Sequence, residues 1–479
     1  MPARHAHLSS TAVRGALAES LAELRRDLEL PTAYPAEAES EAAAVVDGPP
    51  VDGSDDEREE LADVPFHTID PVGSRDLDQA LHLERAGEGL LVRYAIADLA
   101  AFVRPGGALD AETRRRGQTL YAPDGSVPLH PLVLSHGAAS LLPGERRRAY
   151  VWTFRLDGRG AVRETRLVRA WIRSVRQWTY AEAQAAIDDG SAPAAVALLR
   201  EFGPLRIALE AERGGASLNS PEEEVVEGPD GYELRRRTPL PVEEWNAQLS
   251  LMTGMAAADL MLSARVGILR TLPPAEPEAL AEFRRKVALL DRPWPEGIAY
   301  GECLRRLDPA DAATPAVLQA ASALFRGAGY APFDGEPPAQ AEQAAIGAPY
   351  AHATAPLRRL VDRWALAICE AEANDRPIPA WARESLSELP RIMQESGALA
   401  SRLEGGAVDR IEAAVLHGRI GDVLDAVVLA ETKGGARVQI ADPFVTATIR
   451  DKPDPGSRIR VRVVDTRIPS GEVDLELVL

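Results

Sequence analysis

The chain has 479 residues, of which 46% are hydrophobic and 27% charged, a composition typical of a globular protein with about three domains. No apolar run approaches the ~20 residues that span a bilayer, and the first residues lack the apolar stretch of a secretory signal. We therefore expect a cytoplasmic protein without membrane contact. The only two cysteines, Cys303 and Cys369, exclude a disulfide scaffold and a cysteine-rich zinc site.

The formal net charge of −19, taken as an average, argues against a polyanionic partner. The charge is distributed unevenly, however. Residues 1–65 hold 5 basic and 15 acidic residues, a net charge of −10, whereas residues 418–479 hold 9 and 10, a net charge of −1. A nucleic acid would therefore bind away from the N-terminal segment.

The first 65 residues have the pattern of a helical, acidic segment. Apolar residues recur at spacings of three and four through residues 10–30, which predicts an amphipathic helix. Residues 36–46 predict a second, alanine-rich helix, and residues 48–60 predict a polar, solvated linker. We assign residues 1–65 to an N-terminal helical segment.

From residue 66 the pattern is first that of strands and then that of helices. Apolar runs predict strands at residues 66–69, 80–83, 90–97, 151–156 and 161–175. Helical periodicity follows at residues 180–213, 244–265, 278–290, 314–326, 356–373, 380–404 and 407–416. Strands followed by helices favour an α+β domain over a doubly wound sheet, and we assign residues 66–417 to it.

The last part of the chain, residues 418–479, returns to the strand pattern. Runs separated by Gly- and Pro-containing turns predict strands at residues 422–430, 437–440, 445–450, 458–464 and 473–478. Five short strands of this kind fit a small β-barrel of the OB type, with a generic β-domain as the alternative.

Three aspartates surround a Pro–Gly turn in the segment 66–81, FHTIDPVGSRDLDQAL. Asp76 and Asp78 are two residues apart, so their side chains point to the same face of an extended backbone, while Leu77 points to the packed side. Asp70 lies across the turn. Like charges at one place are costly unless they are compensated, and carboxylate oxygens suit Mg²⁺. The alternative is a polar turn whose aspartates cap backbone amides.

A second candidate site lies where a helix is predicted to begin. The periodicity of residues 356–373, with Pro356 at the first position, places Arg358 and Arg359 in the first turn. Exposed amides, the helix dipole and two guanidiniums would form a phosphate site that complements a metal across a phosphodiester. The alternative is an ion pair between Arg358 and Asp362, with Arg359 simply solvated.

Together these segments resemble the ribonuclease II family of 3′→5′ exoribonucleases, which are built on the RNB catalytic domain. Residues 68–80, TIDPVGSRDLDQA, and residues 350–360, YAHATAPLRRL, resemble the two main motifs of the family. Shorter matches follow in the family's order: IADL at 96–99, RGQTLY at 116–121, VPLHP at 127–131 and SLLPG at 140–144. The resemblance covers about residues 64–417, and the OB-type barrel agrees with the RNA-binding barrel in which the family commonly ends.

The resemblance implies an RNB-type catalytic domain of mixed sheet and helices, and it implies the roles of several residues. Arg358 would hold and polarise the scissile phosphate. Tyr121 would stack on a base near the 3′ end of the RNA, and Arg359 and Glu404 would contribute to RNA binding. The implied metal ligands, which would also orient the attacking water, are Asp70, Asp76 and Asp78.

The sequence departs from the family pattern at several points. Gln79 stands where the family usually has a further aspartate of the metal site; its amide oxygen can still bind Mg²⁺, but one negative charge is lost. Ala355 and Leu360 replace the usual serine and tyrosine. The N-terminal segment does not resemble the cold-shock barrels that are common in the family.

These observations lead to one main hypothesis and two alternatives. The main hypothesis is a Mg²⁺-dependent, processive 3′→5′ exoribonuclease that hydrolyses single-stranded RNA to nucleoside 5′-monophosphates and acts as a monomer. The first alternative, motivated by Gln79, is a non-catalytic or weakly active RNA-binding protein on an RNB scaffold. The second is a phosphotransferase or phosphatase with a DxD motif, which requires a doubly wound parallel sheet and no terminal barrel.

Overall fold

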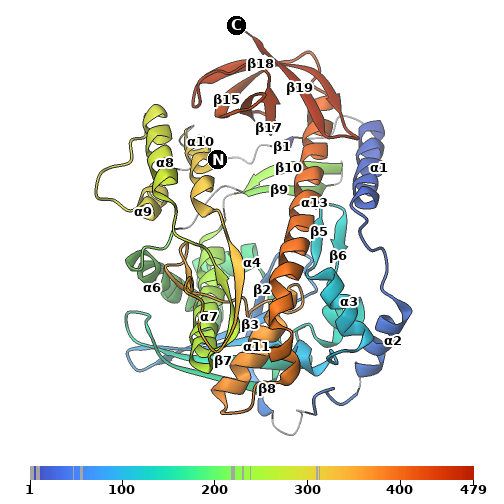
Figure 1. Ribbon diagram of the computed structural model, residues 1–479, viewed down its shortest axis with the longest axis vertical. Helices are drawn as coiled ribbons and strands as arrows, with labels where there is room; N and C mark the ends of the chain where they lie inside the picture. Colours follow the sequence, from blue (N-terminus) through green and yellow to red (C-terminus); the bar gives the residue numbers. More distant parts are fainter. Residues whose placement is uncertain are drawn as a thin grey trace.

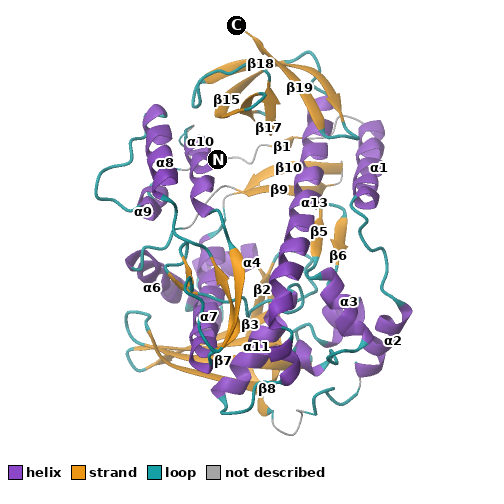
Figure 2. Cartoon of the chain, viewed as in Figure 1, coloured by secondary structure: helices purple, strands orange, loops and turns teal. Residues whose placement is uncertain are grey.

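The computed structural model describes residues 5–6, 11–46, 48–53, 58–216, 222–228, 231–237, 239–308, 311 and 313–478. Two closed five-stranded β-barrels lie at opposite ends of the molecule, and the long helix α13 (Leu389–His417) runs between them (Figure 1). Most of the other helices lie between the barrels or along their sides (Figure 2). Within the described ranges, none of the helices has the length and apolar character needed to cross a membrane.

The first barrel has the strand order β2-β3-β4-β7-β8 and is closed by parallel pairing of β2 with β8, all other neighbours being antiparallel. Its strands are β2 (Glu59–Asp70), β3 (Gln79–Ala86), β4 (Gly89–Ala97), β7 (Arg146–Leu156) and β8 (Val162–Thr179). The strands predicted from the sequence all fall within these five. A closed antiparallel barrel contradicts the doubly wound sheet that the phosphotransferase alternative requires.

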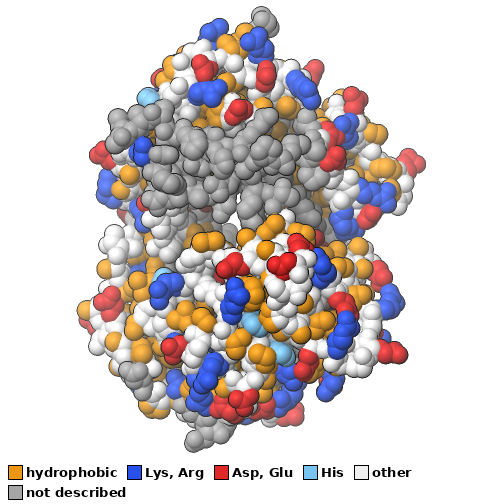
Figure 3. All heavy atoms as spheres, turned by 180° about the vertical axis from the view of Figure 1, so that it is seen from behind, with side chains coloured by type: hydrophobic (Ala, Val, Ile, Leu, Met, Phe, Trp, Pro, Cys, Tyr) orange, Lys and Arg blue, Asp and Glu red, His pale blue; other side chains and the backbone are white. Residues whose placement is uncertain are grey.

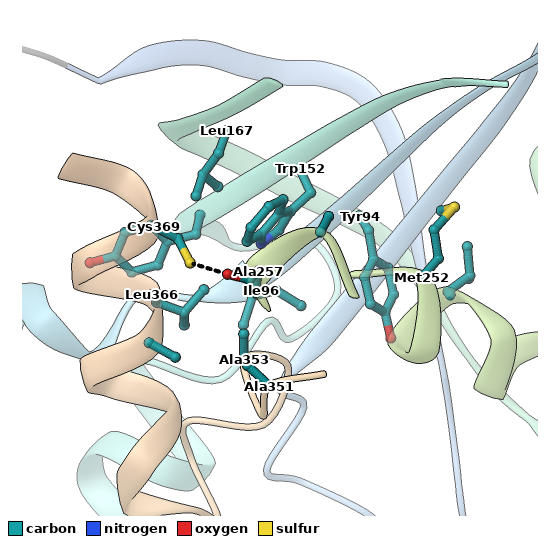
Figure 4. Packing of buried hydrophobic residues seen from close by; sticks show 14 of the residues in the cluster. Tyr94, Ile96, Trp152, Leu167, Met252, Ala257, Ala351, Ala353, Leu366 and Cys369 are labelled. Atoms are coloured by element: carbon teal, nitrogen blue, oxygen red, sulfur yellow. Dashed lines mark hydrogen bonds between the residues drawn. The ribbon is translucent and has the colours of Figure 1, made fainter. Parts of the chain in front are cut away.

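Both faces of β4 are buried, which explains its continuous apolar run LLVRYAIA. Tyr94 and Ile96 join a cluster with helices α7 (Pro241–Ala264) and α11 (Leu360–Ala373), whereas Ala95 and Ala97 join a separate cluster. Figure 4 shows part of the first cluster, in which the thiol of Cys369 donates a hydrogen bond to the carbonyl of Ala257 over 3.4 Å. Cys369 is thus a fully buried residue of the core.

The second barrel has the strand order β15-β16-β17-β19-β18 and confirms the predicted OB-like module. Its strands are β15 (Val423–Thr432), β16 (Gly435–Ala441), β17 (Phe444–Ile449), β18 (Arg458–Arg467) and β19 (Glu472–Val478). Alternating residues such as Val461 and Val463 are fully buried, while their neighbours face outward. Five short amphipathic strands therefore bury one common core.

The N-terminal segment forms helices α1 (Thr11–Asp27) and α2 (Ala36–Val45) as predicted. α1 lies beside α13, and the hydroxyl of Ser20 donates a hydrogen bond to the carbonyl of Ile468 in the second barrel. β2 begins at Glu59, so the first barrel starts inside the range assigned to the N-terminal segment. Residues 54–57 of the predicted linker lie outside the described residues.

The remaining elements cover the first barrel and the sides of the molecule. The helices are α3 (Ala108–Arg116), α4 (Tyr180–Asp189), α5 (Ala194–Ala197), α6 (Leu199–Glu212), α8 (Pro277–Leu289), α9 (Tyr300–Arg305), α10 (Thr314–Ala321) and α12 (Ala380–Glu384). The strands are β1 (His5–Ala6), β5 (Leu120–Ala122), β6 (Gly125–Val127), β9 (Glu222–Gly228), β10 (Gly231–Arg237), β11 (Val266–Thr271), β12 (Gly329–Asp334), β13 (Glu342–Gln343) and β14 (Ala348–Pro349).

Two predicted helix boundaries in this part of the chain are wrong. The single helix predicted over 180–213 is three helices, because Gly190 ends α4 in the left-handed conformation and Pro193 begins the next element. The helices predicted at 380–404 and 407–416 are largely the single α13, which continues through Gly405 and Gly406. A Cβ on Gly406 would lie 3.0 Å from the side chain of Leu24, so this glycine lets α1 approach α13 closely.

A buried ion cluster fixes the first barrel to the segment that precedes it. The carboxylate of Asp98 accepts hydrogen bonds from Arg58 over 2.6 Å and from Arg169 over 2.7 Å, and it caps a short helical turn through the amide of Ala101. Burial alone would raise the pKa of Asp98, but the two guanidiniums together lower it to about 2. The charged carboxylate is therefore strongly favoured in the folded state.

We predict that Asp98→Asn lowers the free energy of unfolding by about 3–5 kcal/mol at pH 7, because Arg58 and Arg169 lose the buried carboxylate that they share and Arg169 keeps only its ion pair with Asp52. The folded pKa lies below the ordinary value of 3.8, so this stabilisation is complete above about pH 4 and is lost as the pH falls toward 2. Urea unfolding of wild type and variant across this pH range measures the difference. Asp188→Asn, which removes an exposed ion pair with Arg200, is the control and should change stability little.

Candidate active site

The three aspartates are held by the turn between β2 and β3. β2 ends at Asp70, Gly73 takes a positive φ of 82°, and the chain then runs extended into β3. The hydroxyl of Ser140 receives a hydrogen bond from the amide of Leu77 over 3.0 Å and donates one to the carbonyl of Arg75 over 2.6 Å. Leu77 is fully buried, as the alternation predicts, and the turn is pinned on both sides of it.

Asp78 joins this turn to a segment some 280 residues later in the chain. One carboxylate oxygen of Asp78 accepts a hydrogen bond from the amide of Leu357 over 2.7 Å, and the other accepts one from Nε of Arg358 over 3.2 Å. Asp78 is buried, while the Arg358 side chain is 45% exposed. The two predicted sites therefore meet directly.

The predicted start of the following helix is wrong, and Asp362 shows why. α11 begins at Leu360, not at Pro356, and Arg359 has an extended conformation. The buried carboxylate of Asp362 accepts hydrogen bonds from the amide of Ala355 over 2.7 Å and from the guanidinium of Arg359 over 2.8 Å. These bonds hold residues 355–359 as a turn outside the helix.

The arginines consequently have different surroundings from those expected. Arg359, not Arg358, forms the ion pair with Asp362, so the predicted alternative pairing is also wrong. The first amide of α11, that of Leu360, donates to the carbonyl of Gly117 and is not available for a phosphate. An anion at this site would thus be bound by the side chain of Arg358 more than by the helix terminus.

Four of the predicted residues line one pocket of about 540 Å³. Arg358 and Arg359 form one side, Glu404 on α13 forms another, and Tyr121 on β5 closes the pocket toward the aspartates. The Tyr121 side chain is 52% exposed, and its hydroxyl donates a hydrogen bond to Asp76 over 3.0 Å. The structure therefore brings the predicted RNA-binding residues together beside the predicted catalytic ones.

The aspartates carry the electrostatic signature of a site that favours an additional cation. Burial raises the pKa of Asp70 to about 7 and that of Asp78 to about 8, although Arg358 opposes both shifts. One oxygen of Asp70 is buried without a hydrogen-bond partner. In the described part of the chain, however, no three Asp, Glu, His or Cys side chains converge closely enough to form a complete metal cage. The carboxylates fit Mg²⁺ by their chemistry, with further ligands to come from water and substrate.

Gln79 is placed differently from the expected metal ligand. Its amide nitrogen donates a hydrogen bond to the carbonyl of Thr354 over 2.6 Å, and its amide oxygen accepts one from the hydroxyl of Tyr94 over 2.9 Å. Both ends of the side chain are therefore engaged with protein groups.

Several groups that shape this site were not predicted from the sequence. Asp362 and His130, whose ring nitrogen lies 3.2 Å from the carbonyl of Leu357, hold the segment around Arg358, and Tyr94 is linked to that segment only through Gln79. Each belongs to a segment already matched or predicted as a regular element. In the sequence, the only indication of such a role is a polar residue at a core-facing position. That position does not reveal which group the side chain will bind.

Comparison with known proteins places the chain in a family. Residues 58–370 match the RNB domain, and residues 422–478 match the RNase II-type exonuclease C-terminal S1 domain. The chain belongs to the RNB-domain family. This confirms both the resemblance to the ribonuclease II family and the predicted fold, an RNB domain followed by an OB-like barrel.

The chain is similar to parts of several longer RNB proteins. Ribonuclease R of Escherichia coli (strain K12) is 26% identical over 462 residues, covering 88% of this chain and 55% of the relative. A probable exosome complex exonuclease RRP44 of Caenorhabditis elegans is 32% identical over 235 residues, covering 48% of this chain and 24% of the relative. The chain thus spans about half the length of the first and a quarter of the second.

Two solved structures share the fold of this RNB protein. RNase R of Mycoplasma genitalium in complex with ribose-methylated single-stranded RNA has a TM-score of 0.86 at 17% identity, covering 97% of this chain and 78% of its own. Yeast Ssd1, described as a pseudonuclease, has a TM-score of 0.70 at 17% identity, covering 96% and 58%. The same fold therefore occurs in a protein bound to RNA and in one described as inactive.

We predict that Arg359→Ala lowers the free energy of unfolding by about 3 kcal/mol, because the buried Asp362 loses its counter-charge. Denaturant unfolding at neutral pH measures the loss. Arg391→Ala, which removes an exposed ion pair with Glu395, is the matched control and should have a much smaller effect. Equal stability of the two variants would contradict a bracing role for Arg359.

Proposed function

We propose that this protein is a Mg²⁺-dependent, processive 3′→5′ exoribonuclease that hydrolyses single-stranded RNA to nucleoside 5′-monophosphates. The observation that carries the proposal is the contact between Asp78 and Arg358 at the edge of the pocket that Tyr121 and Glu404 also line. It places a buried carboxylate next to a guanidinium, a pairing suited to phosphodiester hydrolysis with a bound metal. Membership of the RNB family and the names of the relatives support the same activity.

The aspartates and Arg358 have separate roles in the proposed hydrolysis. Asp70, Asp76 and Asp78 would hold Mg²⁺, which when bound polarises the phosphate and lowers the pKa of a water. Arg358 binds the scissile phosphate through its exposed guanidinium and offsets the charge that develops on its oxygens. Water attacks the last phosphorus, the 3′ oxygen of the preceding nucleotide leaves with a proton, and a nucleoside 5′-monophosphate is released.

The pocket walls position the end of the RNA. The half-exposed ring of Tyr121 offers a face on which a base stacks, while its hydroxyl remains bound to Asp76. Glu404 and Arg359 also line the pocket, where they would contact the terminal nucleotides. Figure 3 shows the face opposite to that of Figure 1, where acidic and basic side chains are mixed over the described surface. RNA binding therefore depends more on the side chains of the pocket than on the overall charge of the protein.

The second barrel supplies a further contact for the incoming strand. Phe444 is the only aromatic residue in 418–479, so stacking there is limited and arginine side chains carry the binding. Exposed arginines alternate along β18 at positions 458, 460 and 462. Continued contact with the strand behind the cleaved end is what makes degradation processive.

A second candidate function is RNA binding without hydrolysis. Two observations favour it: the amide of Gln79 stands in place of a carboxylate and is engaged by Thr354 and Tyr94, and the fold is shared with the pseudonuclease Ssd1. The retained aspartates and Arg358 argue for the enzyme.

A single assay separates the two functions. Poly(A) labelled at its 5′ end is incubated with the protein in Mg²⁺ and, separately, in excess chelator. Progressive shortening to a small oligomer in Mg²⁺ alone supports the exoribonuclease. Binding without shortening, measured by filter retention, supports the non-catalytic protein.

We predict that Asp78→Asn abolishes cleavage and leaves the Kd for RNA within a few-fold of wild type. The variant loses a carboxylate at the reacting phosphate, while the pocket walls that bind RNA remain. Cleavage rates in Mg²⁺ and Kd values in chelator measure the two effects, with Asp188→Asn as the control. Wild-type cleavage by Asp78→Asn would overturn the assignment of the catalytic carboxylates.

We predict that Tyr121→Ala weakens RNA binding by about 5- to 150-fold, which corresponds to roughly 1–3 kcal/mol of base stacking. Tyr121→Phe keeps the ring and loses only the hydrogen bond to Asp76, so its Kd should stay near that of wild type. Titration of labelled oligo(A) in chelator compares the two variants. A similar loss in both would show that the hydroxyl, not the ring, is responsible.

A further inference from the structure

Gln79, the residue that follows Asp78, links the start of β3 to the segment that carries Arg358. Its amide nitrogen donates to the carbonyl of Thr354, at 2.6 Å, across a separation of 275 residues in the sequence. Gln79 is the first residue of β3 and pairs with Ile96 on β4, so its backbone is fixed in the barrel. The side chain is therefore a bridge between a rigid strand and an irregular segment.

A hydrogen-bond chain sets the orientation of this amide. The hydroxyl of Tyr94 donates to the amide oxygen of Gln79 over 2.9 Å and lies 3.0 Å from the hydroxyl of Ser250 on α7. Tyr94 is buried, and Figure 4 shows its ring beside Met252 of the same helix. Because the Thr354 carbonyl can only accept, the nitrogen of the amide must face it and the oxygen must face Tyr94.

Several carbonyls of the segment that Gln79 holds accept hydrogen bonds from other parts of the protein or from within the segment. The Ala355 carbonyl accepts from the amide of Arg359, and the Arg358 carbonyl accepts from the amide of Thr119. The Thr354 carbonyl, in a residue that is only 3% exposed, has the Gln79 amide as its hydrogen-bond donor. Removing that donor would leave a buried acceptor unsatisfied and would free the segment next to Leu357 and Arg358.

We propose that Gln79 is a positioning residue that sets the spacing between Asp78 and Arg358, and that it does not act as a ligand of the metal. This inference rests on the exoribonuclease function proposed above, because that function gives the Asp78–Arg358 spacing its importance. It assigns Gln79 a role that a carboxylate at the same position cannot perform. An ionised carboxylate would place an oxygen against the Thr354 carbonyl oxygen, where the two repel each other.

The variant Gln79→Glu separates the two roles, because it has the same shape, loses the donor and gains a potential metal ligand. Gln340→Glu is the matched control: Gln340 also donates to a backbone carbonyl, that of Glu342 over 3.2 Å, but it is exposed and does not line the pocket. Cleavage of 5′-labelled poly(A) gives kcat, KM and the Mg²⁺ concentration for half-maximal rate. Melting temperature and the Kd for oligo(A) are measured in chelator.

If Gln79 positions the site, Gln79→Glu lowers kcat at least tenfold at pH 8, leaves KM and the Kd within about threefold, and does not lower the Mg²⁺ requirement. Its melting temperature in chelator falls relative to that of Gln340→Glu. If Gln79→Glu retains the wild-type kcat, or needs less Mg²⁺ at equal or higher kcat, the proposal is overturned. If the wild-type protein does not cleave poly(A), the proposed function is refuted instead. The cleavage rate of the wild type is measured first, so this outcome is told apart from a failure of the proposal about Gln79.

Tyr94→Phe tests the hydrogen-bond chain from Tyr94 to Gln79 without altering the charge of the site. This variant fills the same space and removes only the hydroxyl that orients the amide, so we expect a kcat reduced about two- to tenfold with the Kd for RNA unchanged. Combined with Gln79→Glu it should add little further loss, because both substitutions remove the same constraint. Fully multiplicative losses would show that Tyr94 and Gln79 act independently and would contradict the proposal.

Discussion

The carboxylate of Asp78 is the point at which two distant parts of the chain are joined. It is buried, and it accepts one hydrogen bond from the backbone beside Arg358 and another from the arginine itself. Burial of such a group is costly unless these bonds form, so the same contact that completes the fold also places a guanidinium beside the carboxylates. Stability and the proposed chemistry therefore depend on one interaction.

A set of buried polar side chains surrounds this contact and constrains the segment before α11 from several sides. Asp362 accepts hydrogen bonds from the amide of Ala355 and from Arg359. His130 lies against the carbonyl of Leu357, and Gln79 donates to the carbonyl of Thr354. An irregular segment keeps a defined shape only when its backbone groups find such partners. The exposed face of the pocket, with Tyr121 and Glu404, is thus backed by a rigid wall.

Much of this organisation could be predicted from the sequence. Alternating and periodic apolar residues located the barrel strands and most helices, and the motifs around Arg358 and Tyr121 identified residues that share the pocket. What could not be predicted depends on particular contacts between side chains and backbone groups. The start of α11 is set by Asp362 and not by Pro356, and the partner of Gln79 lies 275 residues away. Local propensity carries no information about either contact.

The unbroken helix α13 has a mechanical consequence. At 1.5 Å per residue its 29 residues form a rod about 43 Å long. Glu404 projects from the middle of this rod into the pocket, while the far end of the rod contacts β18 and β19. Gly406 allows α1 to lie tightly against it, which stiffens the rod at its midpoint. The pocket wall and the terminal barrel are therefore attached to one continuous helix, so a single element sets their relative position.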